Sequence, residues 1–148
     1  MNPNPSSRTF VLLVALVMAL AAAGCADVPL VGKRERTTAF DDATDNYGKM
    51  LRWGYFDEAA KYLRAQDGST VEPDLDRVAR YRVTSYTVSS KLLADTGREG
   101  RVVATIEYYE IDSGVLRSLR DEQFWWHDRE SDNWYLSSPL PAFGIAGR

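Results

Sequence analysis

The sequence predicts an α+β domain in which an N-terminal helical pair packs on a curved, four-stranded antiparallel meander sheet. Just after residue 37, apolar residues recur at spacings of three and four, which is the period of an amphipathic helix. From residue 78 onward, β-branched and aromatic residues dominate four runs that are separated by turn signals, which is typical of strands. Helices followed by consecutive strands indicate the α+β class.

The helical part is predicted as two helices. The first begins at Thr38, and its inward positions are Phe40, Ala43, Tyr47, Met50 and Gly54, with Leu51 beside them. Gly54 is a suitable residue to end this helix. The second helix is predicted over Asp57–Arg64, with Asp57 as its N-cap and with Ala60 and Leu63 turned inward.

The sheet is predicted as four strands, at Val78–Ser90, Arg101–Ile111, Val115–His127 and Trp134–Ser138. In the first strand the apolar positions change from odd to even numbers near Thr84, which predicts a bulge or a sharp bend there. The second strand is apolar on both faces and is expected to be central. Gly97 and Gly100 are expected to mark a turn, and Pro139 and Pro141 to end the fourth strand.

The N-terminal residues resemble a targeting signal. The apolar run Phe10–Ala23 has 14 residues, and as a helix it would reach only ~21 Å, short of a hydrocarbon core of ~30 Å. The end of this run and the two residues after it, Ala22-Ala23-Gly24-Cys25, resemble the lipobox of bacterial lipoproteins, although Ala22 stands where Leu is usual. The resemblance implies cleavage between Gly24 and Cys25 and a lipid on Cys25. An ordinary secretory signal or an uncleaved anchor is the alternative.

This resemblance implies a signal peptide at 1–24, a lipidated cysteine and tether at 25–37, and one periplasmic domain at 38–148. Pro29 and Gly32 are expected to keep the tether irregular, and its basic run is either a solvated spacer or a contact with anionic lipid. Ala26 follows the cysteine where Asp would resemble an inner-membrane retention signal. We therefore expect the protein in the inner leaflet of the outer membrane, facing the periplasm.

Composition excludes several classes of function. A net charge of −3 argues against a nucleic-acid binder, which would be basic. A single cysteine excludes an internal disulfide and a cysteine-based zinc site. Neither a metal-ligand spacing nor a glycine-rich phosphate loop occurs in the sequence, so no metal and no cofactor is expected.

A second resemblance concerns the domain itself. The phrase from Gly54 to Tyr62 resembles the helix–turn–helix opening of nuclear transport factor 2-like domains, of the cystatin-like superfamily. The strands that end in Phe124-Trp125-Trp126 and Trp134-Tyr135-Leu136 resemble the curved sheet of that fold. The resemblance implies a cone between helices and sheet, and the fold hosts enzymes and non-enzymes alike. A lipocalin-like fold is the structural alternative.

Two residues are weak catalytic candidates, Asp121 and His127. His127 is the only histidine, but we expect it at a wet turn edge after the third strand. Asp121 shares a strand face with Trp125. If that face is concave, desolvation would raise the Asp121 pKa toward general-base work. We favour the other reading, a solvent-facing carboxylate paired with a cross-strand cation such as Arg82 or Arg101.

The tryptophans are stronger indicators of function than Asp121 and His127. Trp125, Trp126 and Trp134 form the candidate binding surface. Adjacent Trp125 and Trp126 must point to opposite faces of one strand, so one lies under the helices and the other on the outer face. The outer one either contacts a partner or is covered by loops or by residues 141–148.

The expected function is that of an outer-membrane-anchored lipoprotein with a binding or structural accessory role, bound to the membrane through its lipid and to an envelope protein. The chain is expected not to be an enzyme. The alternative is a small-molecule-binding or enzymatic domain with a polar cavity, and an open pocket of ~300 Å³ or more with convergent polar groups would favour it.

Overall fold

The computed structural model describes residues 28–69 and 71–144. The predicted signal peptide, its cleavage position at Gly24 and the lipidation of Cys25 lie outside these residues. The chain divides into two compact units at residue 35, and the α+β domain belongs to the second, residues 35–148. The described elements are the helices α2 (Val28–Trp53), α3 (Phe56–Ala60) and α4 (Leu75–Val78) and the strands β1 (Tyr81–Leu93), β2 (Glu99–Glu110), β3 (Leu116–Asp128) and β4 (Asn133–Leu136).

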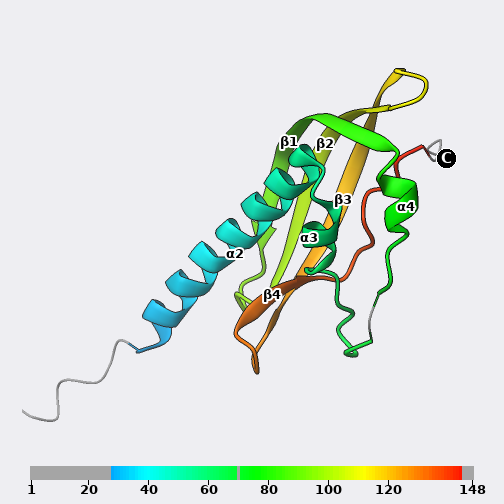
Figure 1. Cartoon of the computed structure of the whole chain (residues 1–148). Coiled ribbons are helices and arrows are strands. Elements are labelled where there is room, and N and C mark those ends of the chain that lie inside the picture. The colour runs from blue at the N-terminus through cyan, green and yellow to red at the C-terminus, as the bar shows by residue number, and fades with distance from the viewer. Residues whose placement is uncertain (1–27, 70, 145–148) are drawn as a thin grey trace, which may run out of the picture. The chain divides into compact units, whose positions relative to one another are not determined.

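The predicted fold class is confirmed. Four antiparallel strands follow one another in the order β1-β2-β3-β4, so each strand pairs with its neighbour in sequence. From residue 35 on, α2 lies with α3 on one face of this curved sheet (Figure 1). The core between them is strongly aromatic: Tyr47 of α2 meets Trp125 of β3 edge-on at 5.5 Å between ring centroids, and Phe40 meets Trp134 at 4.8 Å.

Helix α2 begins at Val28, ten residues before the predicted start at Thr38, so residues 28–37 are helical where an irregular tether was expected. Pro29 does not prevent this, because a proline in the first turn removes no intrahelical hydrogen bond. Gly32 lowers helix stability by only about 1 kcal/mol. Phe40, Tyr47 and Leu51 are buried as predicted, and Ala43 and Met50 are partly buried against the core. Gly54 was expected to face inward too, but a side chain there would meet open space.

Gly54 ends α2 as predicted. Its φ of +74° is a conformation that glycine adopts without strain. The Gly54 N–H donates to the Leu51 carbonyl at 3.2 Å, and the Tyr55 N–H donates to the Met50 carbonyl at 2.9 Å. This pair of bonds is the Schellman motif, which satisfies the last carbonyl groups of the helix.

Helix α3 is shorter than predicted. It begins at Phe56, with no side-chain cap at Tyr55, so Asp57 lies inside the first turn and the prediction that it is the N-cap is wrong. The helix ends at Ala60 because the following residues pair with the sheet instead. Leu63 forms a parallel bridge with Leu136, so this segment covers the outer edge of β4.

Strand β1 contains the predicted bulge and a second one. The register against β2 shifts between Val83 and Ser85, and again between Val88 and Ser90. The hydroxyls of the two extra residues donate to carbonyls of β2, Thr84 to Glu107 at 3.1 Å and Ser89 to Val103 at 3.0 Å. Each bulge reverses the side-chain alternation. The inward residues are therefore Tyr81 and Val83, then Tyr86 and Val88, then Lys91 and Leu93.

Candidate functional site

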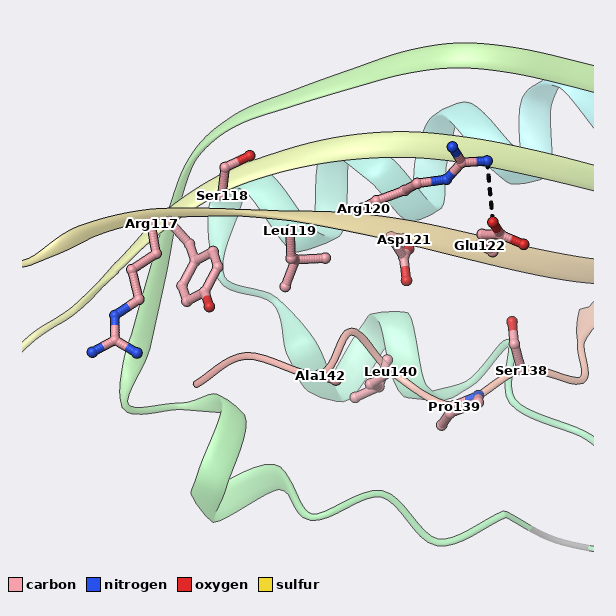
Figure 2. Close-up of a pocket in the computed structure, with 11 residues that line it drawn as sticks. Arg117, Ser118, Leu119, Arg120, Asp121, Glu122, Ser138, Pro139, Leu140 and Ala142 are labelled. Atoms are coloured by element: carbon pink, nitrogen blue, oxygen red, sulfur yellow. Dashed lines mark ion pairs between the residues drawn. The ribbon is translucent and has the colours of Figure 1, made fainter. Parts of the chain in front are cut away.

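A cavity of about 610 Å³ lies between residues 117–122 of β3 and residues 138–142, which follow β4. We call it the β3 cavity. Leu119 and Asp121 point from the strand toward the segment that carries Pro139 and Leu140 (Figure 2). Most of the surface of the β3 cavity is apolar, and the carboxyl group of Asp121 points into the cavity.

The β3 cavity exists because the sheet loses a strand at this point. Strand β4 pairs with β3 only from Trp125 to Asp128. The same register continued toward the C-terminus would set Pro139 opposite Glu122 and Pro141 opposite Arg120. A ladder would need an N–H at both of these positions, and proline has none. The segment therefore turns away from β3 and buries Leu140 and Phe143 in the core instead.

Asp121 is the central residue of the β3 cavity, with 8% of its surface exposed. Its Oδ2 accepts a hydrogen bond from Gln123 Nε2 at 2.7 Å. No described lysine, arginine or histidine nitrogen lies within 4.0 Å of the carboxylate. Burial raises the pKa of Asp121 to about 6, and the Gln123 hydrogen bond opposes part of that rise.

The favoured sequence interpretation of Asp121 is therefore wrong, and the concave-face alternative is correct. Neither predicted cation reaches it. Arg82 donates to the backbone carbonyls of Ala79 and Tyr81, and Arg101 pairs with Glu122 on the outer face. The reason is the alternation along β3, which sends Asp121 inward and its neighbours Arg120 and Glu122 outward (Figure 2).

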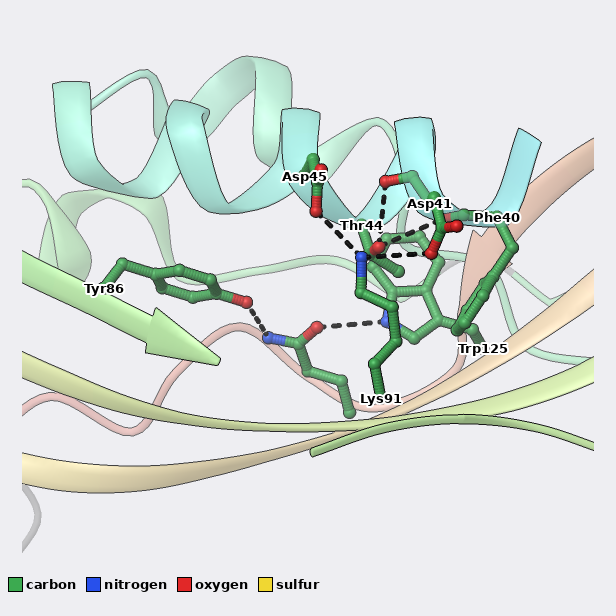
Figure 3. A network of polar contacts seen from close by, with 8 residues as sticks. Phe40, Asp41, Thr44, Asp45, Tyr86, Lys91 and Trp125 are labelled. Carbon is green, nitrogen blue, oxygen red and sulfur yellow. Dashed lines mark hydrogen bonds and ion pairs between the residues drawn. The ribbon is translucent and has the colours of Figure 1, made fainter. Parts of the chain in front are cut away.

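Gln123 holds the carboxyl group in place through a network that sequence reasoning missed. Its Nε2 also donates to Tyr86 Oη at 2.8 Å, and its Oε1 accepts from Trp125 Nε1 at 3.0 Å (Figure 3). Gln123 is 1% exposed, so the whole amide is fixed by protein partners. The only signal in the sequence was its shared strand face with Asp121 and Trp125.

Two phenols face the same network. Burial raises the pKa of Tyr86 to about 12, and the Asp121 charge adds to the rise. Burial also raises the pKa of Tyr47 well above its ordinary value, again with a contribution from the Asp121 charge. The Tyr47 hydroxyl has no hydrogen-bond partner among the described residues. Both phenols therefore stay protonated at neutral pH beside the carboxyl group.

His127 does not share this site. It is 9% exposed, with Nε2 at 3.1 Å from Oδ1 of Asp132 and its ring edge-on to Trp134. The expectation of a wet turn edge is wrong because β3 continues to Asp128 and its odd-numbered residues face the core. His127 lies six positions after Asp121 along the strand, a distance of roughly 20 Å.

The three tryptophans lie in different surroundings and do not form one exposed surface. Trp125 and Trp134 are in the core at 2% and 4% exposure. Trp126 lies on the outer face as one of the pair had to, but it is half-buried: its Nε1 donates to the Arg64 carbonyl at 2.8 Å and its ring packs on Tyr135. A loop thus covers part of the outward indole.

Within residues 28–69 and 71–144, no group of three histidine, cysteine or acidic side chains could hold a metal ion. No helix in that part of the chain combines the length and the apolar character needed to cross a membrane. No protein-family model, curated protein or solved structure matches the chain.

Proposed function

We propose that the chain is a lipid-anchored, periplasm-facing lipoprotein whose α+β domain binds a ligand in the β3 cavity through Asp121. The observation that carries this proposal is a carboxyl group, 8% exposed and without a cationic partner among the described residues, that opens on a cavity of about 610 Å³. That volume lies in the usual range of ligand pockets, ~300–1,000 Å³.

The chemistry of the β3 cavity indicates the class of ligand. With a pKa of about 6, Asp121 is mostly ionised at neutral pH, and a buried charge without a partner is costly. An ammonium, guanidinium or amide N–H of a ligand would supply the missing partner. Leu119, Pro139 and Leu140 offer apolar contact beside it. Arg117 and Arg120 also line the cavity, and Arg120 pairs with Glu122 at 3.1 Å. Asp121 has no such partner among the described residues, so the position beside it suits a basic group carried on an apolar stem.

An enzymatic role is the second candidate, and the raised pKa of Asp121 is the observation in its favour, because a general base works best near the operating pH. A catalytic site needs further groups for proton transfer or charge stabilisation. His127 is roughly 20 Å away along the strand, and Tyr47 and Tyr86 stay protonated. Tyr108, Arg117 and Arg120 also line the β3 cavity, but no described cation lies within 4.0 Å of the Asp121 carboxylate, so we place binding before catalysis.

The cellular part of the proposal rests on the sequence. A lipid on Cys25 would confine the domain to a membrane surface and raise its effective concentration toward envelope proteins. The proposed membership of the nuclear transport factor 2-like group rests on the resemblance carried by residues 54–62 and by the strands that end in Trp126 and Leu136. Radiolabelled palmitate tests the anchor: label is expected on the wild type and not on Cys25→Ala, and label on neither chain would contradict it.

Binding in the β3 cavity is tested with Nα-acetyl-lysine methylamide, which carries an ammonium on an apolar stem. The full chain in detergent micelles, labelled with ¹⁵N, should show amide shifts at Leu119, Asp121 and Ala142 on titration. Asp121→Asn should abolish these shifts, and Glu122→Gln, which removes the neighbouring outward carboxylate, should keep them. Shifts that persist in Asp121→Asn or that fall elsewhere in the domain would contradict the proposal.

A further inference from the structure

The free edge of β3 beside the β3 cavity carries unpaired backbone groups. The Phe124 N–H donates to Ser138 Oγ at 3.2 Å, and the Phe124 carbonyl accepts from the Ser137 N–H at 2.9 Å, so both groups point away from β2. In a strand, the backbone N–H and carbonyl groups of every second residue point to the same side. The N–H and carbonyl of Glu122 and Arg120 therefore point the same way, and no described backbone group pairs with them there.

An added strand would fit this edge in a defined register. Residues opposite Arg120 and Glu122 would exchange hydrogen bonds with them, and their side chains would lie on the outer face. The residue between them would stand opposite Asp121 with its side chain on the inner face, where Cβ atoms of paired residues lie ~5 Å apart. That position opens on the β3 cavity, so a long side chain has room there.

We propose that the ligand of the β3 cavity is an extended peptide segment that pairs with residues 118–122 of β3 as an added strand and sets a lysine or arginine side chain against Asp121. This inference rests on the proposed function and deepens it by naming the partner class. Charge complementarity selects the basic residue, because Asp121 lacks a cation among the described residues. Unpaired main-chain groups select the extended backbone.

The chain's own C-terminal segment cannot take this place, which keeps the edge open. Pro139 and Pro141 stand at the two positions that would have to donate to Glu122 and Arg120. Prolines and charged side chains are common ways to leave an edge unpaired by its own chain. At this edge the prolines lie beside a cavity and a buried carboxyl group. Protection of an edge from aggregation requires neither of these features.

The test uses the peptide Ac-Val-Thr-Lys-Thr-Val-NH₂ and the full chain in detergent micelles, with affinity measured by calorimetry. N-methylation of both threonines removes the N–H groups that would bond to β3, and the affinity should fall about tenfold or more, as for two lost hydrogen bonds. N-methylation of the lysine, whose N–H would point away from β3, is the matched control and should change affinity far less. Replacing the lysine by norleucine should weaken binding about tenfold.

A pair of protein variants tests the same edge from the other side. Arg120→Pro removes an N–H that no described strand uses, whereas Arg120→Ala keeps it and removes the same side chain. Binding should be lost in the first and kept in the second, with equal melting temperatures showing that both are folded. If Arg120→Pro does not fold, the methylated peptides decide the question.

The outcomes separate this inference from the proposed function. Equal loss from both N-methylated peptides, or equal binding by Arg120→Pro and Arg120→Ala, would overturn the added strand. Binding of acetyl-lysine methylamide at Asp121 with no binding of the peptide would overturn the added strand and leave the cavity as a small-ligand site. A dimer formed through the β3 edges, detected by sedimentation without any peptide, would mean that a second copy of the chain occupies this edge. That result would also overturn the inference of a basic peptide partner.

Discussion

The two halves of β3 obey the same alternation but have opposite surroundings. The closed half, Trp125–Asp128, pairs with β4 along its whole length and with β2 as far as Trp126. Its inward residues pack against aromatic rings of α2 and β4. The open half, Leu116–Glu122, has β2 on one side and the β3 cavity on the other. An inward carboxyl group occurs only in the open half. The break in the ladder at Pro139 and Pro141 therefore separates the part of the strand that packs into the core from the part whose edge has no described strand partner.

Truncation in the closed half should have the largest effect on stability. Trp125→Ala removes a fully buried indole that contacts Tyr47 and Tyr62, and should lower the free energy of unfolding by about 3–5 kcal/mol. Phe124→Ala, one residue away with half of its side chain exposed, should cost about 1 kcal/mol or less. Urea denaturation measures both, and similar losses would contradict the assignment of the two faces.

In the open half, titration of the Asp121 carboxyl group should make the free energy of unfolding depend on pH. Asp121 has a raised pKa in the folded state, so the folded state binds more protons between pH 3.8 and about 6. Its contribution to stability is therefore fully present below pH 3.8 and is lost as the pH rises through 6. At 1.36 kcal/mol per unit of pKa shift, the full effect is about 3 kcal/mol.

Asp121→Asn should remove this pH dependence. The free energy of unfolding of the variant, relative to that of the wild type, should therefore be higher at pH 7.5 than at pH 4. Of the groups that face Asp121, Tyr47 of α2 and Tyr86 of β1 stay protonated over this range. Tyr108, Arg117 and Arg120 also line the β3 cavity. Thermal unfolding between pH 4 and 8 measures the difference, and parallel profiles for both chains would show that Asp121 is solvated.

A glycine in β2 tests how tightly the closed half is packed. A Cβ on Gly100 would lie 2.5 Å from ring atoms of Phe40, so Gly100→Ala should destabilise by about 1–3 kcal/mol through overpacking. Gly114→Ala meets nothing within 4 Å but has a φ of +63°, and should cost about 1 kcal/mol through backbone strain. A Gly100→Ala chain as stable as the wild type would mean that Phe40 does not lie on β2.

Restoring the missing N–H groups should have the smallest effect on stability and a visible effect on binding. The double change Pro139→Ala and Pro141→Ala raises the conformational entropy of the unfolded chain, which destabilises the fold. It also lets the segment form backbone hydrogen bonds with β3, which stabilises the fold. The two effects should nearly cancel, so the free energy of unfolding should change by no more than about 1 kcal/mol. Peptide affinity should fall several-fold because the segment now competes for Arg120 and Glu122. Unchanged affinity would mean that prolines are not what keeps the edge open.

Much of the fold was predictable because it depends on local patterns. The helical period identified Phe40, Tyr47 and Leu51 as buried, and the change of parity in β1 located the bulge at Thr84. The second bulge was missed because Ser89 is a small polar residue that leaves no break in the apolar pattern. The short helix α4, capped by Asp74, was missed because four residues are too few to show a period.

The site was harder to predict because it depends on tertiary pairing. Alternation set Asp121 on the face of Trp125 but could not say which face the helices cover. His127 was expected in water because its neighbours are charged, whereas the strand continues past it into a turn. In the sequence, the two prolines predict only the end of a strand; the register of β4 is needed to show that they also leave the edge of β3 open.

Amide hydrogen exchange at Arg120 and Glu122, in the full chain with and without the lysine peptide, measures whether the open half of β3 is a binding edge. Without peptide both amides should exchange much faster than those of Gln123 and Trp126, which bond within the sheet. With saturating peptide both should become protected. Protection of Arg120 and Glu122 without peptide, or no change when it is added, would contradict the claim that the open half of β3 is a binding edge.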